Sequence, residues 1–232
     1  MSGEAEVPLG VAHTPLRDQI REQLRQRIIN GLLPPGTKMV ERELAAELGV
    51  SRVPVREALR MLESEGFVQV VPRRGVVVKQ LSRTDVEELF DVRESLEVLA
   101  TRRAAENATQ ADLRRLAQHL DKARHAVEAG KLDRFGDANE AFHDEIVRMA
   151  RNGLLAGMLE PLQGRLHWLF RQIGNAEGLW QEHNRLYQAI ASGDPDAAAA
   201  QALDHVRVNR RTALRLLFED PGDTAEALNS SA

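Results

Sequence analysis

Apolar side chains recur every three or four residues along most of this chain, which is the spacing of amphipathic helices. In the first eighty residues the pattern predicts helices over about 15–30, 41–48 and 52–65, and a glycine follows the end of each. Two β-rich runs come next, at 67–71 and 76–80, and the short Gly-containing connection between them is typical of a hairpin. Two short helices joined by a tight turn and followed by a hairpin indicate a winged helix-turn-helix.

Beyond Ser82 the pattern is helical almost to the end of the chain. The predicted helices span about 84–107, 110–129, 131–151, 153–173, 177–191 and 195–218. We therefore expect a mainly α protein, in which a winged helix-turn-helix is followed by an all-α helical bundle. The expected divisions are a flexible N-terminus at 1–13, a first domain at 14–80, a second at 84–218 and a flexible tail at 219–232.

Composition narrows the class of protein. Apolar residues make up 43% of the 232 positions and charged residues 28%, as in ordinary globular proteins. There is no cysteine, which excludes a disulfide framework and any thiolate metal ligand or nucleophile. Residues 1–13 lack the basic start and apolar core of a signal peptide, and no apolar run approaches the roughly 20 residues that span a bilayer. We expect a cytoplasmic protein that does not associate with membranes.

Charge is distributed unevenly along the chain. Between Thr14 and Gln80 there are twelve Lys and Arg and eight Asp and Glu, which gives a local net charge of +4, although the whole chain carries −4. From Leu81 onward the charge is −6. A basic first domain on an acidic second domain indicates two parts with different partners.

The predicted helix over 52–65 has the features of a DNA-reading helix. One face is apolar, with residues spaced as on a buried helix face: Val55, Ala58, Leu59 and Leu62. Another face carries Arg52, Arg56 and Arg60, and guanidiniums in such a row can bind guanine edges or phosphates. Ser51 precedes this helix, where a hydroxyl and free backbone N–H groups favour a phosphate. The ordinary alternative for three arginines on a helix is a solvated charged face.

The first domain closely resembles the GntR superfamily of bacterial regulators, through the motif ERELAAELGVSRVPVREALRMLESEG at 41–66. The resemblance implies DNA contacts from five positions, which are Arg42, Ser51, Arg52, Val53 and Arg56. It also implies that Gly75 of the hairpin enters the minor groove with Arg73 or Arg74 beside it. The residue types agree, because glycine permits close approach of the backbone and arginine suits a narrow, negative groove.

Histidines suggest chemistry in the second domain. Asn139 and His143 are four residues apart and share one face of a predicted helix, while His183 and His205 lie on two later helices. Three imidazoles and one amide oxygen from three helices can bind Zn²⁺ or a similar divalent ion. Scattered histidines are more often surface or core residues, and we assign that role to His119, His125 and His167.

The second domain resembles the FCD effector domain of the FadR-like GntR branch. The matching pieces are FDVRESLE at 90–97, NEAFH at 139–143, Asn152, His183 and Gly193-Asp194 ahead of His205. The resemblance implies a metal site, zinc or another divalent ion such as nickel, with the ligands Asn139, His143, His183 and His205; many members have Asp at the first position. It further implies a homodimer that binds a short palindromic double-stranded operator as a repressor, and a small carboxylate effector bound near the metal. Candidates for binding that carboxylate are Arg93, Arg148 and Arg165.

Two other classes of protein remain open. Glu140-Ala-Phe-His143 matches the Glu-x-x-His element of di-iron helical enzymes, but those need a second copy on another helix, and the sequence has one. It also contains no His-Glu-x-x-His motif, nucleophile elbow or phosphate loop, so we expect no enzyme. An architectural DNA-binding protein without an effector is the other alternative, and it would need no metal.

Overall fold

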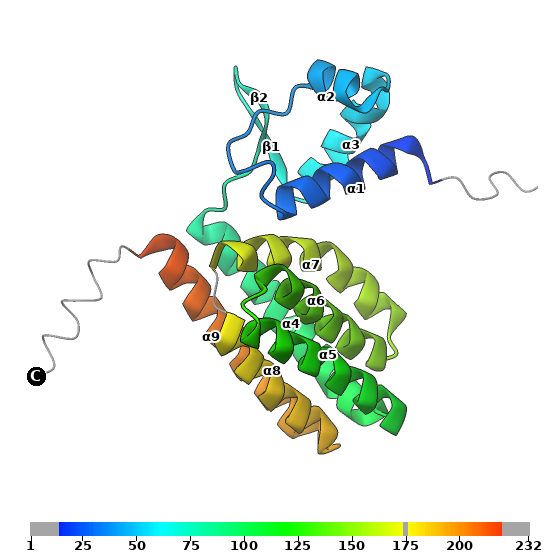
Figure 1. Ribbon diagram of the computed structural model, residues 1–232, viewed down its shortest axis with the longest axis vertical. Helices are drawn as coiled ribbons and strands as arrows, with labels where there is room; N and C mark the ends of the chain where they lie inside the picture. Colours follow the sequence, from blue (N-terminus) through cyan, green and yellow to red (C-terminus); the bar gives the residue numbers. More distant parts are fainter. Residues whose placement is uncertain (1–13, 174–175, 220–232) are drawn as a thin grey trace, which may run out of the picture. The chain divides into compact units, whose positions relative to one another are not determined.

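The computed structural model describes residues 14–173 and 176–219, and the chain divides into two compact units between Gln80 and Leu81 (Figure 1). The first unit contains α1 (Leu16–Ile29), α2 (Glu41–Leu48), α3 (Arg52–Ser64), β1 (Val68–Val71) and β2 (Gly75–Val78). The second contains α4 (Arg83–Asn107), α5 (Gln110–Glu128), α6 (Leu132–Met149), α7 (Gly153–Ile173), α8 (Ala176–Ala191) and α9 (Pro195–Phe218).

The first unit is held together by the apolar face of α3. Its buried residues are those that the sequence pattern predicts: Val55, Ala58, Leu59 and Leu62. They pack in a unit where α3 contacts α1 and α2, and where Leu24 and Ile28 of α1 are fully buried. Gly49 ends α2 in the left-handed conformation at φ 67°, which forms the tight turn into α3. This packing leaves the arginine face of α3 exposed.

The hairpin forms a small wing. β1 and β2 are antiparallel, with Val68 opposite Val78 and Val71 opposite Gly75, and an isolated antiparallel bridge links Lys38 to Val77. Buried Val68, Val77 and Val78 anchor the base of the wing, while its tip is exposed.

The second unit is a bundle of helices packed side by side (Figure 1). α4 packs along α9 and α5 packs along α6, although α4 and α9 lie at opposite ends of this unit in sequence. Capping boxes begin two of the helices: Ser82 and Asp85 at α4, and Thr109 and Asp112 at α5. Asp194 caps α9 by accepting hydrogen bonds from two backbone N–H groups, and Asn152 accepts one from Leu155 N–H near the start of α7.

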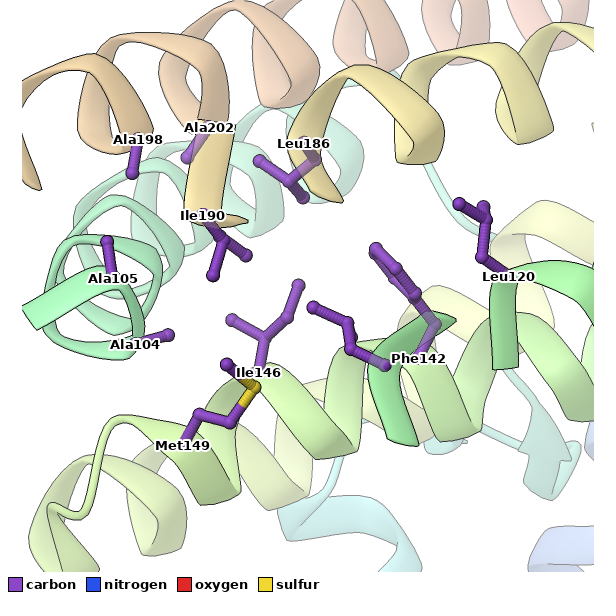
Figure 2. Packing of buried hydrophobic residues seen from close by; sticks show 11 residues of the cluster. Ala104, Ala105, Leu120, Phe142, Ile146, Met149, Leu186, Ile190, Ala198 and Ala202 are labelled. Carbon is purple, nitrogen blue, oxygen red and sulfur yellow. The ribbon is translucent and has the colours of Figure 1, made fainter. Parts of the chain in front are cut away.

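The main core of this unit is built from residues of α4, α5, α6, α8 and α9 (Figure 2). Phe142, Ile146 and Met149 of α6 point toward Leu186 and Ile190 of α8, and all five side chains are buried. Burial of each such side chain contributes about 1.5–3 kcal/mol to folding. His143 follows Phe142 in the chain, so this core fixes the position of the histidine on α6.

The fold class expected from sequence is confirmed, and each helix and strand begins and ends within two residues of its predicted position. The predicted flexible segment 1–13 and residues 220–232 of the predicted tail lie outside the described residues. None of the described helices is long and apolar enough to cross a membrane.

Candidate functional site

Three histidines from three helices meet inside the second unit. His143 comes from α6, His183 from α8 and His205 from α9, and one ring nitrogen of each lies within 4.8 Å of the others. Nε2 of His143 and Nε2 of His183 are 3.2 Å apart. His183 and His205 are buried, and His143 is partly exposed. The predicted histidine cluster therefore forms, although its members are up to 62 positions apart in the sequence.

The surroundings keep all three imidazoles neutral. Burial lowers the pKa of His143 to about 3, and the positive charge of Arg93 acts in the same direction. Burial also lowers the pKa of His183 and of His205 well below the usual range, and the neighbouring histidines and Arg93 add to the effect. Neutral imidazoles are the form that binds metal ions.

Polar groups around the cluster orient two of its members. The amide nitrogen of Asn209, one helical turn after His205, lies 3.3 Å from Nδ1 of that ring. Arg93 Nη2 lies 3.4 Å from Nε2 of His205, and Arg93 Nε donates a 2.6 Å hydrogen bond to Glu97. Phe142 stacks on His183 with ring centroids 4.9 Å apart. These contacts hold the rings of His183 and His205 in place.

A cavity of about 50 Å³ adjoins the cluster. It is lined by Arg93, Glu97, Ala100, Thr101, Asn139, Glu140, His143, Ile146, Val147, Leu159, Gln163, Leu166 and His167. The structure thus brings Arg93 and Asn139 to the same cavity as His143. A water needs roughly 10–15 Å³ by this measure, so the cavity has room for about four waters or a small acid.

The other two candidate arginines do not line this cavity. Arg148 Nη2 lies 2.7 Å from the buried carboxylate of Asp112, and Arg148 Nε donates a 2.7 Å hydrogen bond to the buried Glu145. Arg115 contacts the same two carboxylates, so the four side chains form an ion-pair cluster between α5 and α6. Arg165 is partly exposed on α7 and is absent from the lining of the cavity.

The first unit presents the residues expected to contact DNA on its surface. All eight are exposed: Arg42, Ser51, Arg52, Val53, Arg56, Arg73, Arg74 and Gly75. Val53 is apolar yet 62% exposed at the first turn of α3. Ser51 occupies the N-cap position of α3, but its side chain makes no capping hydrogen bond. Both features leave the start of α3 open to a ligand.

Glu41 of α2 holds Arg56 of α3. Arg56 Nε and Nη2 donate hydrogen bonds of 3.0 and 2.9 Å to the two carboxylate oxygens of Glu41. Arg56 lowers the pKa of Glu41 through these bonds, and the charges of Arg52 and Arg60 add to the shift. Arg52, Arg56 and Arg60 therefore all act on the same carboxylate, as expected for residues spaced along one helix face.

Arg73 and Gly75 give the wing its tight tip. Arg74 N–H donates a 3.0 Å hydrogen bond to Val71 O across a turn with Pro72 at its second position and Arg73 at its third. Arg73 has φ 65° and Gly75 has φ 83°, both in the left-handed region. No atom lies within 4 Å of a Cβ built on Gly75, so backbone conformation rather than space requires glycine there.

Sequence reasoning missed Glu97 and Asn209, the partners of Arg93 and His205. Both were open to detection, since each lies four residues after the residue it contacts and so on the same helix face. The Asp112–Glu145 cluster gave no such signal, because it joins two helices through contacts up to 36 positions apart.

Comparison with known proteins identifies both units. The model of the family described as "Bacterial regulatory proteins, gntR family" matches residues 16–78, and that of the FCD domain matches residues 88–208. The chain is 32% identical over 197 residues to the uncharacterized HTH-type transcriptional regulator YdhC of Bacillus subtilis, which covers 83% of this chain and 88% of YdhC. It is 31% identical to the HTH-type transcriptional repressor RspR of Escherichia coli, with 83% and 86% covered. The solved structure of E. coli McbR/YncC superposes with a TM-score of 0.73 at 27% identity, over 88% of this chain and 99% of that one.

Proposed function

This chain belongs to the GntR family and carries an FCD domain, so it is a DNA-binding transcription regulator, and we propose that a metal-bound small carboxylate controls when it binds DNA. In this proposal His143, His183 and His205 hold one divalent ion, zinc or nickel. The family and its relatives are DNA-binding regulators and not enzymes. Of the two alternatives from sequence, only the effector-independent DNA-binding protein remains to be separated by experiment.

The geometry of the histidines supports a metal site. Two nitrogens bound tetrahedrally to one Zn²⁺ at about 2.1 Å lie roughly 3.4 Å apart. The Nε2 atoms of His143 and His183 are 3.2 Å apart, close to that value. Asn139 is one helical turn before His143 on α6 and lines the same cavity, so its amide oxygen is our candidate for a fourth ligand. An amide is a weaker ligand than a carboxylate, so an effector carboxylate can displace it from the fourth position or add as a fifth ligand.

The cavity defines the class of effector. About 50 Å³ admits a small organic acid but no long acyl chain. Arg93 provides a positive charge for the carboxylate of the acid. Ala100, Ile146 and Leu159 provide an apolar surface for its carbon atoms. The acid would place its carboxylate between the metal and Arg93, where a charge-assisted hydrogen bond is strong.

DNA binding is assigned to the exposed face of α3 and to the wing. Arg52 and Arg56 would contact base edges or phosphates in the major groove, with Arg42, Ser51 and Val53 beside them. Gly75 would approach the minor groove, with Arg73 or Arg74 next to it. Two copies paired through their helical units would then read a palindromic operator, as two-fold symmetry requires.

Regulation follows from linkage between the two sites. An effector that favours a form of the dimer unable to bind DNA must itself bind more weakly to the DNA-bound protein, by the same factor. We propose this direction, in which the effector releases the operator.

The DNA assignment is tested with a duplex that the wild-type protein selects from a random-sequence pool. We expect Arg52→Ala and Arg56→Ala to lose specific binding at fixed salt while keeping the wild-type melting temperature. Arg114→Ala removes the same charge from an exposed position on α5 and serves as the matched control. Unchanged affinity of both α3 variants for the duplex would disprove the assignment.

The effector assignment is tested by measuring operator affinity with acetate or lactate, before and after metal is removed with a chelator. An acid that weakens operator binding only in the metal-loaded protein supports the proposal. The Arg93→Met variant should lose that response and keep its metal. An equal response in chelator-treated and metal-loaded protein would exclude an effector bound at the metal.

A further inference from the structure

A second hollow, which we call the basic groove, lies between α5 and α6 of the helical unit. Its polar lining consists of His119, Lys122, His125, Lys131, Arg134 and Asp137. The groove has a volume of about 600 Å³, far larger than the 50 Å³ cavity beside the histidine cluster. Small-molecule sites commonly occupy about 300–1,000 Å³.

The hollow exists because small side chains line its floor. Ala126 of α5 and Ala138 of α6 are buried, and both belong to an apolar cluster that includes Phe135. Ala129 and Ala141 continue the lining on either helix. The floor is therefore apolar, and the polar groups stand around it.

The rim of the groove is cationic, although the unit as a whole is acidic. The lining contains three cationic side chains, Lys122, Lys131 and Arg134, and one carboxylate, Asp137. By contrast, the chain from Leu81 onward carries a net charge of −6. Within the part of the chain that the structure describes, none of these three cations forms an ion pair. Most other arginines of the unit have carboxylate partners. Unpaired cations around a concave surface attract anions.

His119 brings a polar but uncharged ring to the lining of the groove. Nδ1 of His119 is inaccessible to solvent and has no hydrogen-bond partner among the described residues. Leaving such an atom without a partner costs about 1–3 kcal/mol. Burial and the nearby Lys122 lower the pKa of His119, so its ring is neutral and can donate or accept a hydrogen bond.

We propose that the basic groove binds a small polyanion, a metabolite carrying phosphate groups or several carboxylates, at a site separate from the histidine cluster. A nucleic acid fits less well, because it would meet the repulsion of the whole acidic unit, whereas a small ligand meets only the local cations. The apolar floor accommodates the carbon skeleton of the ligand while Lys122, Lys131 and Arg134 bind its charges.

The groove shares a helix with the metal-site candidates. Arg134 and Ala141 line the groove from α6, and His143 follows two residues after Ala141. A ligand that shifts or stiffens α6 would therefore change the affinity of the histidine cluster for metal, and the two sites would be coupled. Binding in the groove itself does not depend on the function proposed above.

Isothermal titration of the full chain with pyrophosphate and with citrate, at matched ionic strength, tests the proposal. Because both probes also bind metal ions, the titrations use the His143→Ala/His183→Ala variant alongside the wild type. We expect saturable binding of at least one probe to both proteins; pyrophosphate alone would indicate a phosphate ligand, and citrate alone a polycarboxylate. Acetate, with one charge, should not show saturable binding to the His143→Ala/His183→Ala variant, which lacks the proposed metal site.

Variants of the rim locate the binding. Lys122→Gln and Arg134→Gln should each weaken binding of the probe about tenfold, which corresponds to the loss of one charge-assisted contact. Arg114→Gln, on the exposed surface of α5 and outside the lining, should leave it unchanged. The proposal is overturned if neither probe saturates, if all three variants weaken binding equally, or if the rim variants change the oligomeric state by light scattering, which would make the groove a protein interface.

Discussion

The histidine cluster makes the stability of the metal-stripped protein depend on pH. His143, His183 and His205 have lowered pKa values in the folded protein, about 3 for His143, whereas an unfolded histidine titrates near 6.5. Below pH 6.5 these three histidines therefore become protonated in the unfolded chain but stay neutral in the folded protein. Folding stability falls as pH falls from 6.5 toward the folded pKa values, and it is restored as pH rises.

The magnitude follows from the size of the shifts. Between pH 7.5 and 5.5 each of the three histidines costs about 1.4 kcal/mol, so together they cost about 4 kcal/mol. For a unit of this size, each kcal/mol moves the melting temperature by about 2–4 °C, which gives a total fall of about 8–16 °C. The window lies above the usual pKa values of Asp and Glu, so carboxylates contribute less.

Thermal melts of chelator-treated protein at several pH values measure this effect. His143→Gln and His205→Gln should each remove about one third of the pH-dependent loss, whatever their effect on stability at pH 7.5. His125→Gln, at an exposed position, is the control and should follow the wild-type curve. If the melting temperatures of the two cluster variants fall with pH in parallel with the wild type, the histidines do not titrate as described and the reasoning is refuted.

Three further predictions concern single residues. Asp112→Ala should destabilise the helical unit by about 2 kcal/mol, because it removes a helix cap and a buried partner of the arginine cluster, whereas Asp121→Ala at an exposed position of α5 should not; denaturant melts of both variants check this. Glu41→Gln should bind a random-sequence duplex about fivefold more tightly at low salt, because Arg56 loses its carboxylate partner, and an unchanged affinity would contradict this role. Gly75→Ala should strain the wing by about 1–2 kcal/mol and weaken operator binding, and wild-type operator affinity in that variant would remove the wing from the DNA contacts.

Local chemistry explains why the fold was predictable. Glycines at positions that need the left-handed conformation, such as Gly49, mark helix ends in the sequence, and helical spacing identifies the buried face of α3. The left-handed conformation of Arg73 could not be predicted from the sequence, because residues other than glycine rarely adopt it. A serine at 51 predicts an N-cap, and Ser51 does occupy that position without making the side-chain hydrogen bond.

The candidate site was predictable only in part. The spacing of Asn139 and His143 places them on one helix face. His183 and His205 lie on other helices, and the resemblance to a known family is what favoured one shared site over scattered histidines. Arg148 illustrates the limit, since Asp112 and Glu145 bind it from two helices and no local pattern reveals their approach. The basic groove depends in the same way on how α5 and α6 pack.

The central claim is that one metal ion is held by His143, His183 and His205. Diffraction data from crystals of the zinc-loaded protein, collected on both sides of the zinc absorption edge, test this claim. We expect one anomalous peak in the helical unit, about 2.0–2.1 Å from a ring nitrogen of each of the three histidines. No peak at the cluster, or a peak that persists there in the His143→Ala/His183→Ala variant, would contradict it.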